Sequence, residues 1–80
     1  MNAPATERVD AILAIAREVL SHVDIAADDD LMQHGGTSLS IVRIVAMASR
    51  ALNLDINPRD VDGALTVRRL AVVAQPAGGA

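Results

Sequence analysis

The sequence predicts a small all-α domain, a bundle of four helices of which three are longer and one is short. Two helical apolar patterns flank a long polar loop, and an Asn-Pro pair and a threonine fit the starts of two further helices. With 80 residues and no cysteine, phenylalanine, tyrosine or tryptophan, the chain must build one light aliphatic core. We therefore expect a single domain over residues 1–80, with its core at about 6–75 and flexible tails at 1–5 and 76–80.

The first helix is predicted to run from Thr6, which fits an N-cap, to about Val23. Its apolar residues recur at the i, i+3, i+4, i+7 spacing of one buried stripe. These residues are Val9, Ile12, Leu13, Ala16, Val19, Leu20 and Val23.

A long loop, Asp24 to Gly36, should follow this helix. We expect Leu31 and Met32 to anchor it by pointing into the core. The run Asp28-Asp29-Asp30 lacks the alternating ligands and the glycine of a calcium-binding loop. We therefore interpret the three aspartates as solvated charge, and we predict no metal site.

The second helix is predicted over Ser38 to Leu52, and its apolar residues cover more than one face. The predicted core side contains Ile41, Ile44, Val45, Ala48, Ala51 and Leu52. The opposite side contains Leu39, Val42 and Ala46, with Arg43 and Arg50 beside them. An apolar strip flanked by arginines below Ser38 favours a docking face for partner proteins; the alternative is that a loop covers the strip as additional core.

Residues 53–56 alternate between polar and apolar side chains too briefly for a sheet. Asn57-Pro58 fits an N-cap with proline at the first helical position, so a short helix is expected over Pro58 to about Val61, with Gly63 ending it. Thr66 should cap the last helix, which ends before Pro76. The predicted inner face of that helix is Val67, Leu70, Ala71 and Ala74.

The segment Gly35-Gly36-Thr37-Ser38-Leu39 contains the candidate functional residue. Two glycines permit positive-φ backbone and close approach of another protein, and the Ser38 hydroxyl falls where a helix begins. Helix-terminal N–H groups and the helix dipole favour an anion, so a phosphodiester on Ser38 would be stabilised without a cationic side chain of its own. This placement favours an attachment point over a nucleophile.

Composition excludes several other functions. The net charge is −3, and the charges are unevenly distributed, since most acidic residues precede Ser38 and most arginines follow it. The arginines are scattered, however, and no aromatic residue is present to stack on bases. We therefore predict no nucleic-acid binding. The sequence has no thiol and no apolar run long enough to span a membrane, and its first residues lack the charged and apolar regions typical of a signal peptide. We expect a cytoplasmic, membrane-independent monomer.

The motif segment and the predicted helices together resemble a known family. Further matching segments are Arg43-Ile44-Val45-Ala46, Leu54-Asp55-Ile56, Leu65-Thr66-Val67 and Leu70-Ala71, so that the resemblance covers about residues 8–74. The sequence is similar to the carrier proteins of thiotemplate biosynthesis, and among them to the peptidyl carrier (thiolation) domains of nonribosomal peptide synthetases. This resemblance implies a four-helix bundle of the acyl carrier protein type without catalytic activity of its own.

The resemblance also implies a cofactor and partners. A phosphopantetheinyl transferase would attach 4′-phosphopantetheine from coenzyme A covalently to Ser38, with Gly35, Gly36 and Thr37 as the motif loop. The terminal thiol would carry an aminoacyl, aryl or peptidyl group as a thioester in nonribosomal peptide or hybrid polyketide biosynthesis. An adenylation or other acyl-loading enzyme would load it, and condensation, thioesterase or tailoring enzymes would act next. The initial Met1 and short tails favour a free-standing carrier over an excised synthetase domain.

Three alternatives remain. An acyl carrier protein of polyketide or fatty-acid type shares the motif, although the second helix lacks the acidic face that partners of fatty-acid carriers usually read. In a non-catalytic helical interaction module, Ser38 or Thr37 would only cap a helix. In an enzyme, His22 or His34 with Asp30 would activate Ser38, but the sequence has no Gly-x-Ser-x-Gly elbow and too little chain for a substrate pocket.

Overall fold

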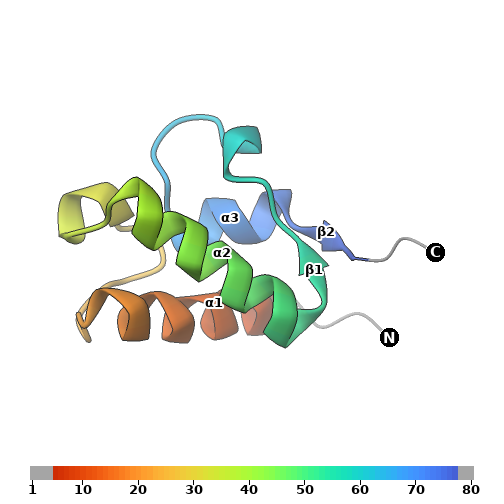
Figure 1. Ribbon diagram of the computed structural model, residues 1–80, viewed down its shortest axis with the longest axis horizontal. Coiled ribbons are helices and arrows are strands. Elements are labelled where there is room, and N and C mark those ends of the chain that lie inside the picture. The colour runs from red at the N-terminus through yellow and green to blue at the C-terminus, as the bar shows by residue number, and fades with distance from the viewer. Residues whose placement is uncertain (1–4, 78–80) are drawn as a thin grey trace.

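The computed structural model describes residues 5–77. In it, helix α1 (Ala5–Leu20) packs against both α2 (Ser38–Leu52) and α3 (Val67–Val73) (Figure 1). Most of the predicted apolar stripe of α1 faces this junction, with Ile12 and Ala16 fully buried. The described helix already includes Thr6, so the predicted N-cap at that residue is wrong.

The helix α1 ends three residues earlier than predicted. Ser21 has a left-handed φ of 52°, and the His22 N–H donates to the Arg17 carbonyl oxygen at 3.0 Å, which turns the chain away from the helix axis. Val23, expected in the buried stripe, therefore lies outside the helix with 78% of its surface exposed.

Two buried side chains, Ile25 and Leu31, hold the long loop after α1 in the core. The Leu31 prediction is confirmed, whereas Met32 is 44% exposed and the prediction that it points inward is wrong. The reason is local structure, because Leu31–His34 forms a single turn of 3-10 helix, η1, instead of irregular loop, and consecutive residues of a helix cannot share one face.

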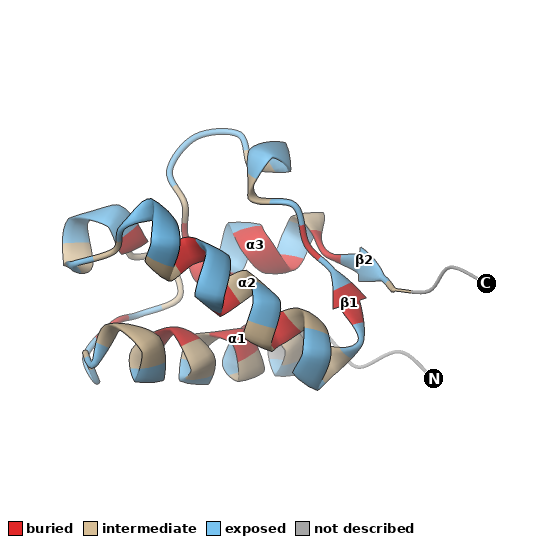
Figure 2. Ribbon diagram, in the orientation of Figure 1, coloured by how far each residue is buried: buried red, intermediate tan, exposed pale blue. Residues whose placement is uncertain are grey.

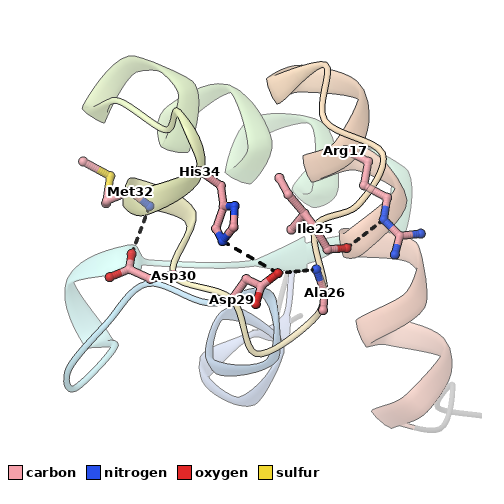
Figure 3. Close-up of polar contacts among 7 residues, drawn as sticks. All are labelled: Arg17, Ile25, Ala26, Asp29, Asp30, Met32 and His34. Atoms are coloured by element: carbon pink, nitrogen blue, oxygen red, sulfur yellow. Dashed lines mark hydrogen bonds and ion pairs between the residues drawn. The ribbon is translucent and has the colours of Figure 1, made fainter.

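Backbone and side-chain hydrogen bonds connect this loop to the helices. The Arg17 Nε donates to the Ile25 carbonyl oxygen at 2.9 Å (Figure 3), and the Arg68 N–H donates to the Ala27 carbonyl oxygen at 3.0 Å. The Arg68 guanidinium also donates to Asp28 Oδ1 at 2.7 Å, and this hydrogen bond to a carboxylate raises the pKa of Arg68. The loop is therefore fastened to α1 and α3, while both members of the exposed ion pair remain solvated.

The helix α2 has the bounds that the sequence predicts. Thr37 is its N-cap, and Asn53 closes it in the left-handed region with a φ of 53° and an N–H that donates to the Ser49 carbonyl oxygen. Ile41, Ile44 and Ala48 are buried, and Figure 2 shows α2 with buried segments (red) alternating with exposed ones (pale blue). The remaining predicted core positions are less buried: Val45 and Leu52 are half-buried, and Ala51 in the last turn is exposed.

The chain after α2 forms a short strand, which corrects the all-α prediction. The strand β1 (Leu54–Asp55) pairs antiparallel with β2 (Gln75–Pro76), Leu54 opposite Pro76 and Asp55 opposite Gln75. Leu54 and Ile56 are buried while Asp55 is exposed, so the brief alternation does mark an extended segment. The fold of residues 5–77 is therefore mostly helical with a two-stranded sheet.

The expected short helix is one turn of 3-10 helix, η2 (Pro58–Asp60), capped by Asn57 as predicted. It stops at Asp60 because Val61 is extended, with φ −75° and ψ 126°, and packs against the core. Within residues 5–77 there are thus three α-helices and two 3-10 turns, and the predicted count of four helices is not confirmed.

The final helix α3 is capped by Thr66 as predicted, and all four predicted inner residues are buried: Val67, Leu70, Ala71 and Ala74. Of the expected tails, Ala5 belongs to α1 and Pro76 to β2, while residues 1–4 and 78–80 lie outside the described part of the chain. Among the helices of the described part, none has the length and hydrophobicity that a membrane crossing requires.

Candidate functional site

The motif loop begins where η1 ends. Gly35 caps η1 in the left-handed region with a φ of 88°, a conformation that glycine adopts without the steric cost of a side chain. The Gly35 N–H and the Gly36 N–H both donate to the Leu31 carbonyl oxygen, the latter at 2.9 Å. This turn redirects the chain from η1 into the start of α2 (Figure 1).

The second glycine is needed for a different reason. Gly36 has no left-handed backbone, but a Cβ at this position would overlap the Leu31 carbonyl group. By contrast, a Cβ at Gly35 would meet no atom within 4 Å. The backbone of η1 therefore occupies the space beside Gly36, and open space surrounds Gly35.

Thr37 caps α2 and leaves the neighbouring serine free. The Thr37 Oγ1 accepts a hydrogen bond from the Ser40 N–H at 3.1 Å and lies 3.1 Å from the Ser40 hydroxyl. Ser38 is the first residue of α2 and is exposed, and no side-chain hydrogen bond within residues 5–77 uses its hydroxyl. The fold thus presents the Ser38 Oγ to solvent beside helix-terminal N–H groups.

Ser38 is among the residues that line a mostly apolar groove with a volume of about 380 Å³. Residues from η1, α2, η2 and the segment before α3 line it: Met32, Ser38, Ile41, Val42, Pro58, Arg59 and Leu65. A serine, several apolar residues and an arginine therefore line one depression of the surface. The sequence interpretation missed Met32, which it placed in the core, and Arg59, which no local pattern connects to Ser38.

The five residues predicted to form a partner face are all exposed on α2, although no contact in the structure tests that role. Leu39 and Val42 are 70% and 59% exposed, and Arg43, Ala46 and Arg50 are exposed as well. Arg43, Ala46 and Arg50 line a shallow hollow of about 260 Å³ together with Met47. The alternative, in which a loop covers this strip, does not hold within residues 5–77.

The histidines considered for an enzyme are engaged elsewhere. The rings of His22 and His34 pack edge to face with centroids 5.4 Å apart, and His34 Nε2 lies 3.8 Å from Asp29 Oδ2 (Figure 3). Asp30 accepts a hydrogen bond from the Met32 N–H at 2.9 Å and so caps η1. No hydrogen bond among the described residues joins either histidine to Ser38, and no cluster of three metal-ligating side chains occurs in this part of the chain.

Comparison with known families identifies the chain. A family model described as phosphopantetheine attachment site matches residues 10–72, which is most of the sequence. The chain belongs to the phosphopantetheine attachment site family. Searches among curated proteins and among solved structures gave no match.

Membership of this family identifies the cofactor as 4′-phosphopantetheine, which the family carries covalently on a serine, and supports a carrier-domain role. When bound, the group supplies a terminal thiol that holds the cargo as a thioester. Carrier domains of this family generally lack catalytic activity and work with a phosphopantetheinyl transferase and with acyl-loading enzymes. The geometry at Ser38 fits such a group, because its hydroxyl is exposed, makes no internal hydrogen bond among the described residues and borders an open groove.

Proposed function

We propose that Ser38 is the attachment serine and that the protein is a peptidyl-type carrier, which passes an aminoacyl, aryl or peptidyl thioester between enzymes of nonribosomal peptide or hybrid polyketide biosynthesis. The observation that carries the proposal is the free, exposed Ser38 hydroxyl at the start of α2, directly after a glycine pair. In the modification, the Ser38 oxygen forms a new P–O bond, the pyrophosphate bond of coenzyme A breaks, and adenosine 3′,5′-bisphosphate leaves. The hydroxyl proton passes to a base on the transferase.

The charge of α2 supports the peptidyl subtype over the fatty-acid subtype. Its charged residues are Arg43 and Arg50, both exposed, and the helix contains no acidic residue. An enzyme that recognises carriers through negative charge would be repelled by this surface. We propose that Leu39, Val42, Ala46 and the two arginines together contact the loading and downstream enzymes, in a cytoplasmic pathway.

The attachment site is tested by intact-protein mass spectrometry after incubation with coenzyme A, Mg²⁺ and a broad-specificity phosphopantetheinyl transferase. The natural chain and a Ser40→Ala variant should each gain one phosphopantetheine, whereas Ser38→Ala should gain none. Ser38→Ala should keep its fold, because Thr37 provides the helix cap. Modification of the folded Ser38→Ala variant would overturn the assignment.

The same holo protein tests the subtype. An aminoacyl- or aryl-adenylating enzyme should load it as a thioester, seen as a further mass increase that hydroxylamine removes. A malonyl-transferring acyltransferase should load it poorly. Efficient loading by the malonyl enzyme alone would instead favour a polyketide or fatty-acid carrier.

A further inference from the structure

The arginines differ in whether their side chains form hydrogen bonds or ion pairs with other parts of the fold. Four of them donate from the side chain to other groups: Arg8, Arg17 and Arg69 to backbone carbonyl oxygens, and Arg68 to Asp28. The side chains of Arg43, Arg50 and Arg59 make no hydrogen bond or ion pair within residues 5–77. These three guanidinium groups are available to bind an anion from outside the fold.

Arg59 differs from the other two in its position. Arg43 and Arg50 line the hollow along α2, whereas Arg59 lines the groove that also contains Ser38. Its backbone is fixed, because it lies in η2 after Pro58 and its N–H donates to Asn57 Oδ1 at 3.0 Å. A fixed backbone with an exposed, unpaired side chain is a suitable anchor for a flexible charged group attached elsewhere in the same groove.

We propose that Arg59 is the cationic partner of the phosphodiester carried on Ser38, and that this pair positions the phosphopantetheine arm over the groove between α2 and η2. The inference rests on the proposed function, because it requires the arm to be on Ser38. A guanidinium is permanently charged and can donate two parallel hydrogen bonds to phosphate oxygens. The groove is complementary to the rest of the arm, since Ile41, Val42 and Leu65 form an apolar wall for its methyl groups.

The Ser38–Arg59 pairing predicts an arm that alternates between a bound and an extended state. A solvated ion pair is weak on its own, but the covalent tether gives the phosphodiester a high effective concentration beside Arg59. A carrier also requires this weakness, because each partner enzyme must draw the arm into its own active site. We therefore expect removal of the Arg59 charge to reduce the bound population by about threefold rather than to abolish it.

Nuclear magnetic resonance of the holo protein tests the proposal, after mass spectrometry has established full modification at Ser38. In the natural chain, cross-relaxation should connect the arm's methyl protons with the methyl groups of Ile41 and Leu65, and attachment should shift the Arg59 side-chain resonances. In holo Arg59→Gln, the cross-relaxation should weaken about threefold. Holo Arg50→Gln, which loses the same charge from the other hollow, should match the natural chain.

The outcomes separate the two proposals. Failure of the natural chain to become modified would overturn the proposed function itself. Full modification with resonance changes confined to the motif loop would overturn only the role of Arg59, as would equal weakening in the Arg50→Gln variant. If the groove resonances move only when a loading enzyme is added, the groove binds a partner protein and the proposal is wrong.

Discussion

At the scale of single residues, the two glycines before Ser38 are required by different parts of the structure. Gly35 supplies a left-handed backbone at the end of η1, and Gly36 leaves room for the Leu31 carbonyl group. A glycine pair in the sequence predicts unusual backbone but cannot assign these two roles, because the second depends on a contact with a residue in the preceding turn. The glycines thereby direct the chain so that Ser38 starts α2 in the open.

Replacing the glycines separately should reveal this difference. Gly35→Ala should lower the free energy of unfolding by about 1–2 kcal/mol, the usual cost of left-handed backbone in a residue with a Cβ. Gly36→Ala should cost about 3 kcal/mol, at the upper end of ordinary substitutions, because the backbone of η1 must move to relieve the overlap. Urea unfolding of the apo protein measures both values. Equal losses in the free energy of unfolding would show that the backbone of η1 can move at Leu31 with little energetic penalty.

At the scale of the elements, α2 separates a structural side from an accessible one. Ile41, Ile44 and Ala48 are buried in the core, whereas Ala46 lies exposed between Arg43 and Arg50 in the sequence of the same helix. A substitution on the accessible side can therefore change recognition without changing packing. Ala46 suits this purpose because it also lies outside the groove beside Ser38.

Ala46→Asp should reduce loading of the holo protein by its acyl-loading enzyme about tenfold in kcat/KM, because it puts negative charge between the two arginines. Stability should change by less than about 0.5 kcal/mol, since i,i+4 and i,i+3 ion pairs offset the lower helix propensity of aspartate. Thermal unfolding and steady-state loading kinetics measure the two effects.

Val72→Asp on α3 is the matched control, because Val72 is also an exposed apolar residue, at 77%. It should leave loading unchanged. Loss of loading in the Val72 variant with normal loading in the Ala46 variant would place the partner face on α3 instead of α2.

The elements also show which features the sequence could predict. The bounds of α2 and the start of α3 follow from local signals, since Thr37 and Thr66 cap them and the apolar spacing is regular. The strand pair could not be predicted, because Leu54 meets Pro76 only after α3 has brought the chain back. The site divides in the same way: the motif is contiguous, whereas Arg59 reaches the Ser38 groove only through the tertiary fold.

At the scale of the whole molecule, Leu31 connects the motif to the core. Its side chain is fully buried, its N–H donates to the Leu65 carbonyl oxygen at 2.9 Å, and its own carbonyl oxygen accepts from the N–H groups of Gly35 and Gly36. The largest fully buried side chains of the described core are all aliphatic: Ile12, Ile25, Leu31, Ile44, Leu70 and Val67. Each of them therefore contributes a substantial part of the hydrophobic stabilisation.

Truncation to alanine should consequently destabilise the protein far more at Leu31 than at the neighbouring Met32. Leu31→Ala should cost about 2–5 kcal/mol, a large fraction of the total stability of a domain of this size. Met32→Ala should cost only about 1 kcal/mol, because its side chain is 44% exposed and lines the open groove instead of filling the core. Urea unfolding measures both costs, and a large loss for Met32→Ala would mean that this side chain, like that of Leu31, packs into the core.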